Sequence, residues 1–315
     1  MKITGLPLSS YSTTLLQGLT TSEVNSLSSK ELSALSTSQI NSLSTDQIQA
    51  ISASAIVGLS AITSLDVSKI FALVTAQIAA LGTGQVGGMS TAQIAALSTD
   101  QIGKLTTAQV VSLSTAQVAA IETQDLAKMT TSQISAMGTR DVASLSSAQI
   151  QALTTDQING MTSSQVKALT TDQLVALTTA QSANLSTAMV SALTSTQIAA
   201  VETADLAAMS TAAIASLTTG QVKALTTDQV VGLSTAQAAA LTTDQVKALT
   251  TAQVSKLETA DLAKLDSAHI QVLSTAAVAS LTTAQVHSLS TEQIAALTSA
   301  QTLSLSTEQI AALQI

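Results

Sequence analysis

The sequence contains no cysteine, so disulfide bridges and thiolate metal sites are excluded. Aromatic residues are nearly absent, with one Tyr, one Phe and no Trp among 315 residues. One proline and 12 glycines leave few of the residues that build the corners of β-rich folds. Lysine and arginine number 11, occur singly and are outnumbered by 19 acidic residues, which gives a net charge of −8. An acidic chain without basic clusters offers no surface for a phosphate backbone, and we expect no nucleic-acid partner.

Long hydrophobic runs are also missing, although 46% of the residues are apolar and the mean hydropathy is +0.42. Ser or Thr interrupts every apolar run within a few residues, whereas a membrane span needs about 18 to 20 apolar residues. We therefore expect no transmembrane span. The N-terminal stretch MKITGLPLSSYS lacks the apolar core of a Sec signal peptide, so export would use another route. The apolar content itself is too high for a disordered chain.

The chain consists of eight-residue repeats, here called octads. From Leu65 to Leu305, 31 consecutive octads begin with Leu, Ile, Met or Val, and position three is Ser or Thr in 30 of them. Position five is Gln in 22 octads and position six is Val, Ile or Leu in 28. The consensus is L-[ST]-T-x-Q-[IV]-x-A. Charged residues occur mainly at the variable positions four, seven and eight, as expected of a solvated face.

An earlier set of octads starts at Tyr11 and runs in a different phase, because the spacing from Leu59 to Leu65 is six rather than eight. We predict an N-terminal segment over 1–10, a first repeat phase over 11–64 and a continuous octad solenoid over 65–315. No Pro or Gly linker accompanies the slip, so these parts are expected to form one structural domain.

The residue order within the octad is a signal for the start of a helix. Ser or Thr at position two is a preferred N-cap, and Gln three residues later completes a capping box, while the apolar residues at positions one and six form a hydrophobic staple. The phrase LSTEQIAAL at 289–297 and 305–313 illustrates both. The predicted capping residues there are Ser290, Gln293, Ser306 and Gln309. The predicted staple residues are Leu289, Ile294, Leu305 and Ile310.

Repeating this signal every eight residues predicts an all-α superhelical solenoid of very short helices, each spanning about positions three to eight. A continuous helix is excluded because its apolar stripe would drift by about 80° per octad. A one-faced strand is excluded because positions one and six would point to opposite sides. Helices of this length are marginal alone, so successive turns must stack on one axial core. The alternative is a β-solenoid, which the abundant Thr favours.

Candidate chemical residues are few, and each has a structural explanation. His269 at position five and His287 at position seven are interpreted as substitutions on the repeat rather than a metal or catalytic pair. Gly84, Gly87 and Gly88 superficially resemble a phosphate-binding loop, but no Lys follows them, and we interpret them as local loosening. No Ser elbow and no Cys/His pair is present, so we expect neither catalysis nor a cofactor.

Paired acids recur in three octads of the form ETxDL. They are candidate ligands of a divalent cation, but the favoured interpretation is that they replace the Ser and Gln of the capping region at the positive helix N-terminus. We therefore predict no metal site. The pairs are Glu122 with Asp125, Glu202 with Asp205, and Glu258 with Asp261. Methionines at position one are expected to belong to the core; they are Met89, Met129, Met137, Met161 and Met209.

Two resemblances follow from these phrases. LTTDQVVGL at 225–233 resembles the opening of the TAL-effector repeat, but it covers nine residues and the rest of that repeat has no counterpart, so DNA reading is rejected. The tandem LTTAQV and LSTAQIAAL phrases over 19–313 resemble the octapeptide tracts of large proteobacterial exoproteins described as adhesin-like. That resemblance implies a secreted or surface-exposed bacterial protein, with a type I system as one export route.

The functional hypothesis is a non-enzymatic structural protein on a bacterial surface, either a rod-like spacer or the subunit of a filament that self-associates head to tail or laterally. The alternative is an adhesin stalk that presents regular rows of Thr to a glycan, a cell surface or ice. The position-three hydroxyls discriminate between these hypotheses, since hydroxyls that cap backbone amides would not be available to a ligand.

Overall fold

The structure, a computed structural model, describes residues 7–313. Within this range the chain forms 36 short α-helices and three 3-10 helices, and it contains no strand. The predicted all-α solenoid of short helices is therefore confirmed, and the β-solenoid alternative is wrong. Thr occupies the first helical turn in most octads, where the capping bonds of the preceding hydroxyl outweigh its preference for strands.

The chain divides into two compact units, residues 1–160 and 161–315. The helices described in the first unit are η1 (Leu8–Ser10), α1 (Thr13–Gln17), α2 (Thr21–Asn25), α3 (Ser29–Ser33), α4 (Thr37–Asn41), α5 (Thr45–Ala50), η2 (Ile56–Gly58), η3 (Ser60–Ser64), α6 (Val67–Ala72), α7 (Thr75–Ala80), α8 (Thr83–Gly87), α9 (Thr91–Ala95), α10 (Thr99–Gly103), α11 (Thr107–Val111), α12 (Thr115–Ala119), α13 (Thr123–Leu126), α14 (Thr131–Ala136), α15 (Thr139–Ala143), α16 (Ser147–Ala152) and α17 (Thr155–Asn159).

The second unit repeats the same pattern without 3-10 helices among its described residues. Its helices are α18 (Ser163–Ala168), α19 (Thr171–Val175), α20 (Thr179–Ala183), α21 (Thr187–Ala192), α22 (Ser195–Ala200), α23 (Thr203–Ala208), α24 (Thr211–Ala215), α25 (Thr219–Ala224), α26 (Thr227–Val231), α27 (Thr235–Ala239), α28 (Thr243–Ala248), α29 (Thr251–Val254), α30 (Thr259–Leu262), α31 (Ser267–Val272), α32 (Thr275–Ala279), α33 (Thr283–His287), α34 (Thr291–Ala295), α35 (Ser299–Leu303) and α36 (Thr307–Ala312).

α16 shows how a six-residue helix of the repeat begins and ends. In α16, the Oγ of the N-cap Ser146 accepts from the backbone of Gln149, and the helix ends at Leu153, which has an extended conformation (φ −62°, ψ 138°). Because Leu153 is also position one of the next octad, the chain leaves one helix and enters the next within two residues. The described α-helices begin at position three and end at position six, seven or eight, close to the predicted span of three to eight.

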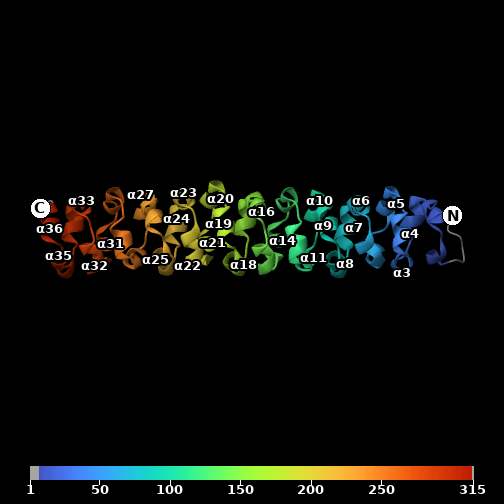
Figure 1. Cartoon of the computed structure of the whole chain (residues 1–315), viewed down its shortest axis with the longest axis horizontal. Helices are drawn as coiled ribbons and strands as arrows, with labels where there is room; N and C mark the ends of the chain where they lie inside the picture. The colour runs from blue at the N-terminus through green and yellow to red at the C-terminus, as the bar shows by residue number, and fades with distance from the viewer. Residues whose placement is uncertain (1–6, 314–315) are drawn as a thin grey trace. The chain divides into compact units, whose positions relative to one another are not determined.

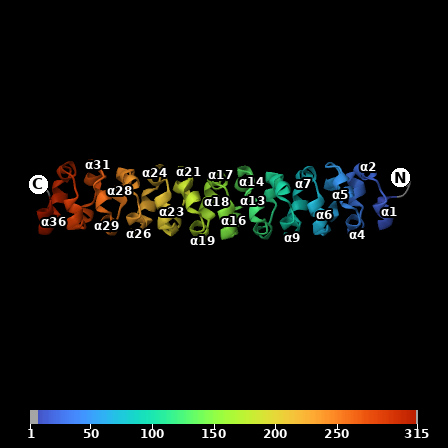
Figure 2. The same ribbon diagram turned by 90° about the horizontal axis from the view of Figure 1, so that it is seen from above.

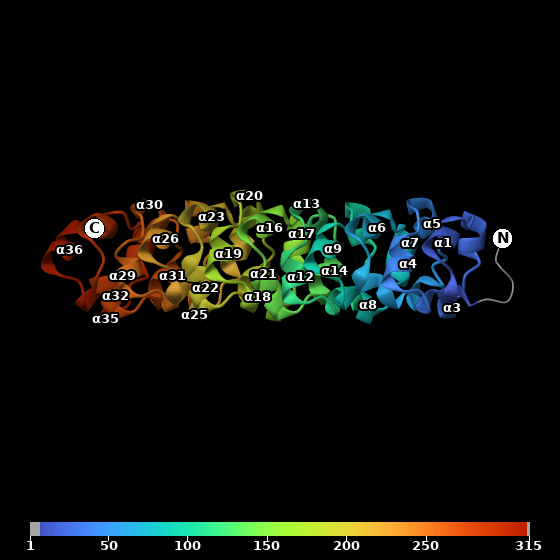
Figure 3. The same cartoon turned by 45° about the vertical axis from the view of Figure 1, so that its right-hand side comes forward.

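Successive helices of each unit wind around an axis, and each packs on the helix three places later (Figure 1). Examples are α8 with α11 and α10 with α13 in the first unit, and α22 with α25 in the second. The same winding is visible within each unit in the two rotated views (Figure 2 and Figure 3). One turn of the superhelix thus takes between three and four octads.

The axial core consists of positions one and six. Leu105 is 4% exposed and Val110 is fully buried, and the same two positions are buried in nearly every octad of both units. The position-one methionines lie in this core, as predicted. Ala, which is common at positions seven and eight, has a short side chain and so leaves room for neighbouring turns to approach closely.

The predicted slip between Leu59 and Leu65 coincides with the two 3-10 helices η2 and η3. An Asn41 side chain bridges this segment, since its Nδ2 donates to Ser64 O (3.0 Å) and its Oδ1 accepts from Asp66 N (3.0 Å). The chain therefore re-enters the octad phase through a local change of helix type. The proposed boundaries at 10 and 64, and the unity of 65–315, stay predictions.

Candidate functional site

The side chain of the position-five Gln links two consecutive turns of the superhelix. Gln109 Oε1 accepts from the backbone N of the N-cap Thr106 (2.7 Å), which completes the capping box. Its Nε2 donates to Ile78 O (2.8 Å) and Leu81 O (2.7 Å), at the end of α7. One buried amide thus satisfies a donor at the start of its own helix and two acceptors at the end of a helix one turn earlier.

We call this arrangement the glutamine ladder. The Nε2 contacts reach carbonyls 28 and 31 residues earlier, and they recur in both units. Its described members with both contacts include Gln47, Gln93, Gln101, Gln109, Gln117, Gln133, Gln149, Gln157, Gln197, Gln221, Gln229, Gln237, Gln245, Gln253, Gln285, Gln293 and Gln301. The sequence analysis found the capping role of Gln but missed the inter-turn role, although a buried amide needs donors and acceptors on both sides.

The capping residues predicted at the C-terminal octads lie at helix starts. Ser290 and Ser306 are the N-caps of α34 and α36, and each Oγ accepts from the backbone N of Gln293 or Gln309 at 3.2 Å. The Gln side chains accept in return from the N-cap amides at 2.8 and 2.7 Å. These hydroxyls are therefore occupied by the backbone.

The predicted staple residues of the same octads differ in burial. Leu289 and Leu305 are buried, Ile294 is half-buried and Ile310 is 47% exposed. Ile310 departs from the general pattern because no described later turn packs against it, whereas the position-six residues of inner turns are covered from both sides.

The position-three hydroxyls do not serve as the caps. In α11 and α12, Thr107 and Thr115 follow the capping residues and are exposed. Some of these hydroxyls bond to an acid of the next turn, as Thr115 does with Asp141 Oδ1 (2.9 Å). The outer surface therefore carries rows of Thr in which individual members are engaged by acids.

Four octads carry Asp instead of Gln at position five. Asp125, Asp141, Asp205 and Asp261 are all buried. Asp125 Oδ1 accepts from the hydroxyl of Thr99 (2.7 Å), which lies 26 residues earlier in the turn below. A carboxylate cannot donate to carbonyls, and in the octads of Asp125 and Asp141 a bond from a Thr hydroxyl takes the place of the ladder contact.

The acids of the ETxDL octads take the places of the capping Ser and Gln, as interpreted, but the Glu side chain makes no bond to the helix start. Glu122, Glu202 and Glu258 occupy the N-cap positions of α13, α23 and α30 without a side-chain bond to the helix start. Such a bond is worth about 1 kcal/mol, so these octads are locally less stable. Burial raises the pKa of Asp125, the Thr99 hydroxyl opposes this, and the Glu122 charge adds to the increase.

Asp261 is the least satisfied of these acids. Both of its carboxylate oxygens are buried without a hydrogen-bond partner among the described residues. Burial raises the pKa of Asp261, the nearby Thr235 hydroxyl counters this increase only in part, and the Glu258 charge adds to it. Burial without a donor penalises the charged form in the folded state.

We predict that Asp261→Gln stabilises the protein by about 2 kcal/mol at pH 7, because the amide can donate to Val230 O and Leu233 O and each hydrogen bond contributes about 1 kcal/mol. The folded pKa of Asp261 is raised, so its penalty is present above that pKa and fades as pH falls toward the unfolded value. The stability gained by Asp261→Gln should therefore be smaller at pH 4 than at pH 7, as measured by urea unfolding followed by circular dichroism. Asp244→Gln, at an exposed position of α28, is the control and should change stability little.

The two histidines have separate partners. His269 takes the place of a ladder Gln, with Nε2 2.7 Å from Leu241 O and Nδ1 2.9 Å from Asp266 Oδ1. His287 is exposed, and its Nδ1 lies 3.3 Å from Ala312 O. The bond from His269 N holds the pKa of Asp266 below its usual range. Within residues 7–313, no group of three or more His, Asp or Glu side chains is placed to hold a metal ion.

Of the glycines predicted to loosen the repeat locally, Gly84 and Gly87 differ in how closely they are packed. A Cβ at Gly84 would meet nothing within 4 Å, but a Cβ at Gly87 would lie 2.7 Å from Ser112 O. Gly87 therefore allows a close approach of the next turn.

None of the helices described has both the length and the apolar composition needed to cross a bilayer.

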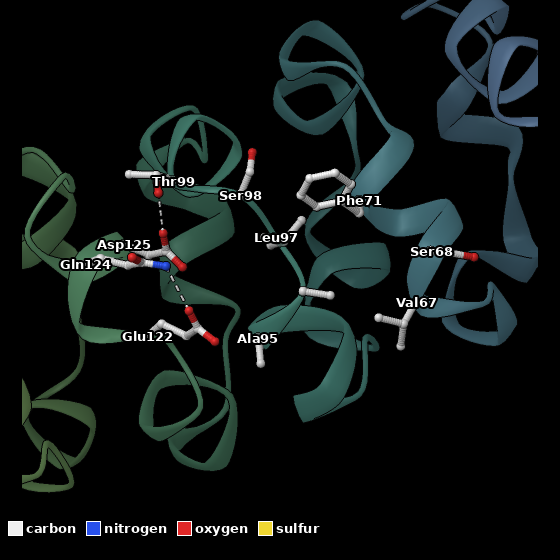
Figure 4. Close-up of a pocket in the computed structure, with 11 residues that line it drawn as sticks. Val67, Ser68, Phe71, Ala95, Leu97, Ser98, Thr99, Glu122, Gln124 and Asp125 are labelled. Carbon is white, nitrogen blue, oxygen red and sulfur yellow. Dashed lines mark hydrogen bonds between the residues drawn. The ribbon is translucent and has the colours of Figure 1, made fainter.

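A surface groove of about 550 Å³ lies in the first unit between α6, α9 and α13. Val67 and Phe71 of α6 line one side, and Glu122, Gln124 and Asp125 line the other (Figure 4). Phe71 is 64% exposed and Val67 is 44% exposed. Phe71, the only Phe of the chain, at a position that holds Ala in 14 of the 31 octads from Leu65, was the signal in the sequence that could have pointed to this groove.

The chain matches the family described as the ALTTAQ repeat, and no curated protein matches it. The matches cover residues 83–115, 118–155, 135–171, 150–179, 198–235, 231–257 and 254–291, and together they span more than half of the chain. The matched residues carry the capping box, the staple and the glutamine ladder of both units. The chain is thus a structural repeat protein that belongs to the ALTTAQ repeat family.

Proposed function

We propose that this protein is a non-enzymatic, rod-like spacer of a bacterial surface. The observation that carries the proposal is the glutamine ladder. It uses the most regular polar side chain of the octad to join one turn to the next, and it leaves that side chain buried rather than facing a substrate. A buried amide with all its hydrogen bonds made stabilises the stack and adds no reactive group to the surface.

The ladder also makes octads interchangeable. Each Gln needs only the two carbonyls at the end of a helix one turn earlier, and every octad supplies such carbonyls. The length of a spacer can therefore change by whole octads while every turn keeps equivalent contacts. This property suits a protein whose role is to set a distance.

The first octads depart from the ladder at position five. Position five there is Leu15, Glu23 and Glu31 instead of Gln. Glu23 and Glu31 complete capping boxes by accepting from Thr20 N (2.9 Å) and Ser28 N (2.8 Å). An ionised carboxylate only accepts, so Glu23 and Glu31 keep the cap without supplying a ladder donor.

The competing proposal is an adhesin stalk that presents rows of Thr to a glycan, a cell surface or ice. The exposure of Thr107 and Thr115 favours it. The spacer is preferred because two of these hydroxyls, those of Thr99 and Thr115, are engaged by Asp side chains. The likeness of the octads to exoprotein tracts supports a location outside the cell for either role.

The test compares the full chain with a variant that lacks residues 225–240, which are two whole octads. We expect both proteins to sediment as one species over a hundredfold range of concentration, with the same helical circular dichroism per residue. A control that lacks residues 225–236, one and a half octads, should lose helix and stability because its ladder is out of register. Growth of the sedimenting species with concentration would support a filament instead. Failure of the two-octad deletion to fold would contradict the interchangeable spacer.

A further inference from the structure

On the apolar side of the groove between α6 and α13, the residues differ from those that the repeat usually has. Position three usually holds Thr and position seven usually holds a small residue, but α6 carries Val67 and Phe71 there. These residues are four apart in one helix and so lie on the same face. Both are exposed, which leaves their apolar surface in water without the stabilisation that burial would provide.

The opposite side of the groove is anionic. Glu122 gives up the capping role that Ser or Thr has at this position, and its Oε2 instead accepts from Gln124 Nε2 (2.9 Å). Asp125 lies beside it, bonded to Thr99. None of the residues that line the groove is Lys, Arg or His, so the two carboxylates face the apolar wall without a cation among the groove's own residues.

An aromatic face next to a carboxylate is chemically complementary to a guanidinium group. Arginine stacks its planar guanidinium on aromatic rings, packs its methylene groups on apolar surface, and pairs with carboxylates through directed hydrogen bonds. The floor, formed by Ala95, Ala96 and Leu97, is apolar and suits an alkyl stem. The views of Phe71 and Glu122 on opposite sides of the groove fit such a side chain lying between them (Figure 4).

We infer that this groove docks an arginine-bearing segment of a partner polypeptide, with the arginine stem against Phe71 and Val67 and its guanidinium at Glu122. The spacer would then carry a specific attachment point on its surface. The inference does not depend on the spacer role, because it rests on the groove alone.

The chain contains a matched site for comparison. Glu258 and Asp261 lie 136 residues after Glu122 and Asp125, which is a whole number of octads. The residues that correspond to Val67 and Phe71 in that place are Thr203 and Ala207. The second site therefore keeps the acid pair and lacks the apolar wall.

Phe71 is the only Phe in the sequence, so labelling the full chain with 4-fluorophenylalanine places a single fluorine reporter in the groove. The probes are the peptide acetyl-Gly-Arg-Gly-amide and its neutral analogue with citrulline. We expect the arginine peptide to shift the fluorine resonance in a saturable way with a dissociation constant of about 1 mM, the affinity of a single weak contact. The citrulline peptide should bind about tenfold more weakly.

Two variants complete the experiment. Glu122→Gln should weaken binding of the arginine peptide about five- to tenfold, because a charge-assisted contact becomes a neutral one. Glu258→Gln should leave the titration unchanged. Circular dichroism checks that both variants are folded. Equal shifts by the arginine and citrulline peptides, no saturable shift, or a Glu122→Gln titration like that of the parent would each overturn the inference.

Discussion

Replacing Gln109 by Glu should destabilise the protein by about 2–4 kcal/mol at pH 7, because two buried carbonyls lose their donor and face a carboxylate. Gln109 Nε2 is the donor to Ile78 O and Leu81 O, whereas its Oε1 accepts from Thr106 N. A carboxylate keeps the bond from Thr106 N and removes the bonds to Ile78 O and Leu81 O. Urea unfolding followed by circular dichroism, with hydrogen exchange of the α7 and α11 amides, measures the effect.

The pH dependence identifies the cause. The folded pKa of the introduced Glu should lie above its unfolded value, since burial against carbonyls disfavours the charge. The loss of stability caused by Gln109→Glu is then complete above the folded pKa of the introduced Glu. It decreases as pH falls through that pKa, because the protonated acid donates one hydrogen bond. Gln49→Glu makes the same chemical change at an exposed position of α5 and should cost little. A pH-independent loss at Gln109, or an equal loss at Gln49, would contradict the ladder.

Replacing Gly58 by Ala should destabilise the first unit by about 1–3 kcal/mol through overpacking. A Cβ at Gly58 would lie 2.0 Å from Ser29 O and 2.5 Å from Ser29 C, so η2 and α3 would have to separate. The neighbour is backbone and cannot rotate away as a side chain could. The urea midpoint, compared with that of the parent protein, gives the measurement.

Gly84→Ala is the matched control for this substitution and should have the opposite sign. Its Cβ would meet nothing within 4 Å, and Gly84 lies inside α8. Alanine in a helix interior is more stable than glycine by about 0.5–1 kcal/mol. Equal effects of the two substitutions would mean that the contact between η2 and Ser29 is not tight.

The fold was predictable from the sequence because its determinants are local. Ser290 and Gln293 lie three residues apart, and this spacing alone specifies a helix start at Thr291. Apolar residues at positions one and six then leave one way to bury them, which is to stack successive octads. The β alternative arose from Thr, whose strand preference is weak compared with a satisfied cap.

The inter-turn contacts were not predictable by the same means. The partners of Gln109 lie 28 and 31 residues away, and this distance depends on how many octads make one turn. The packing of the core sets that number, and no motif within one octad encodes it. The groove was missed for a related reason, since Phe71 and Glu122 are 51 positions apart and only the winding of the chain brings α6 near α13.

The direction of the glutamine ladder has a consequence for how the chain is made. The ladder donors reach back to carbonyls 28 and 31 residues earlier, and Gln77 and Gln85, which follow the slip, to carbonyls 26 and 29 residues earlier. The acceptors of each octad are therefore synthesised before its donor, and its ladder bonds need no residue that is still to be synthesised. The sequence separation of these contacts also stays constant as the chain grows, so the loop-closure entropy per added octad does not increase with length. A chain built in this way can lengthen without becoming harder to fold.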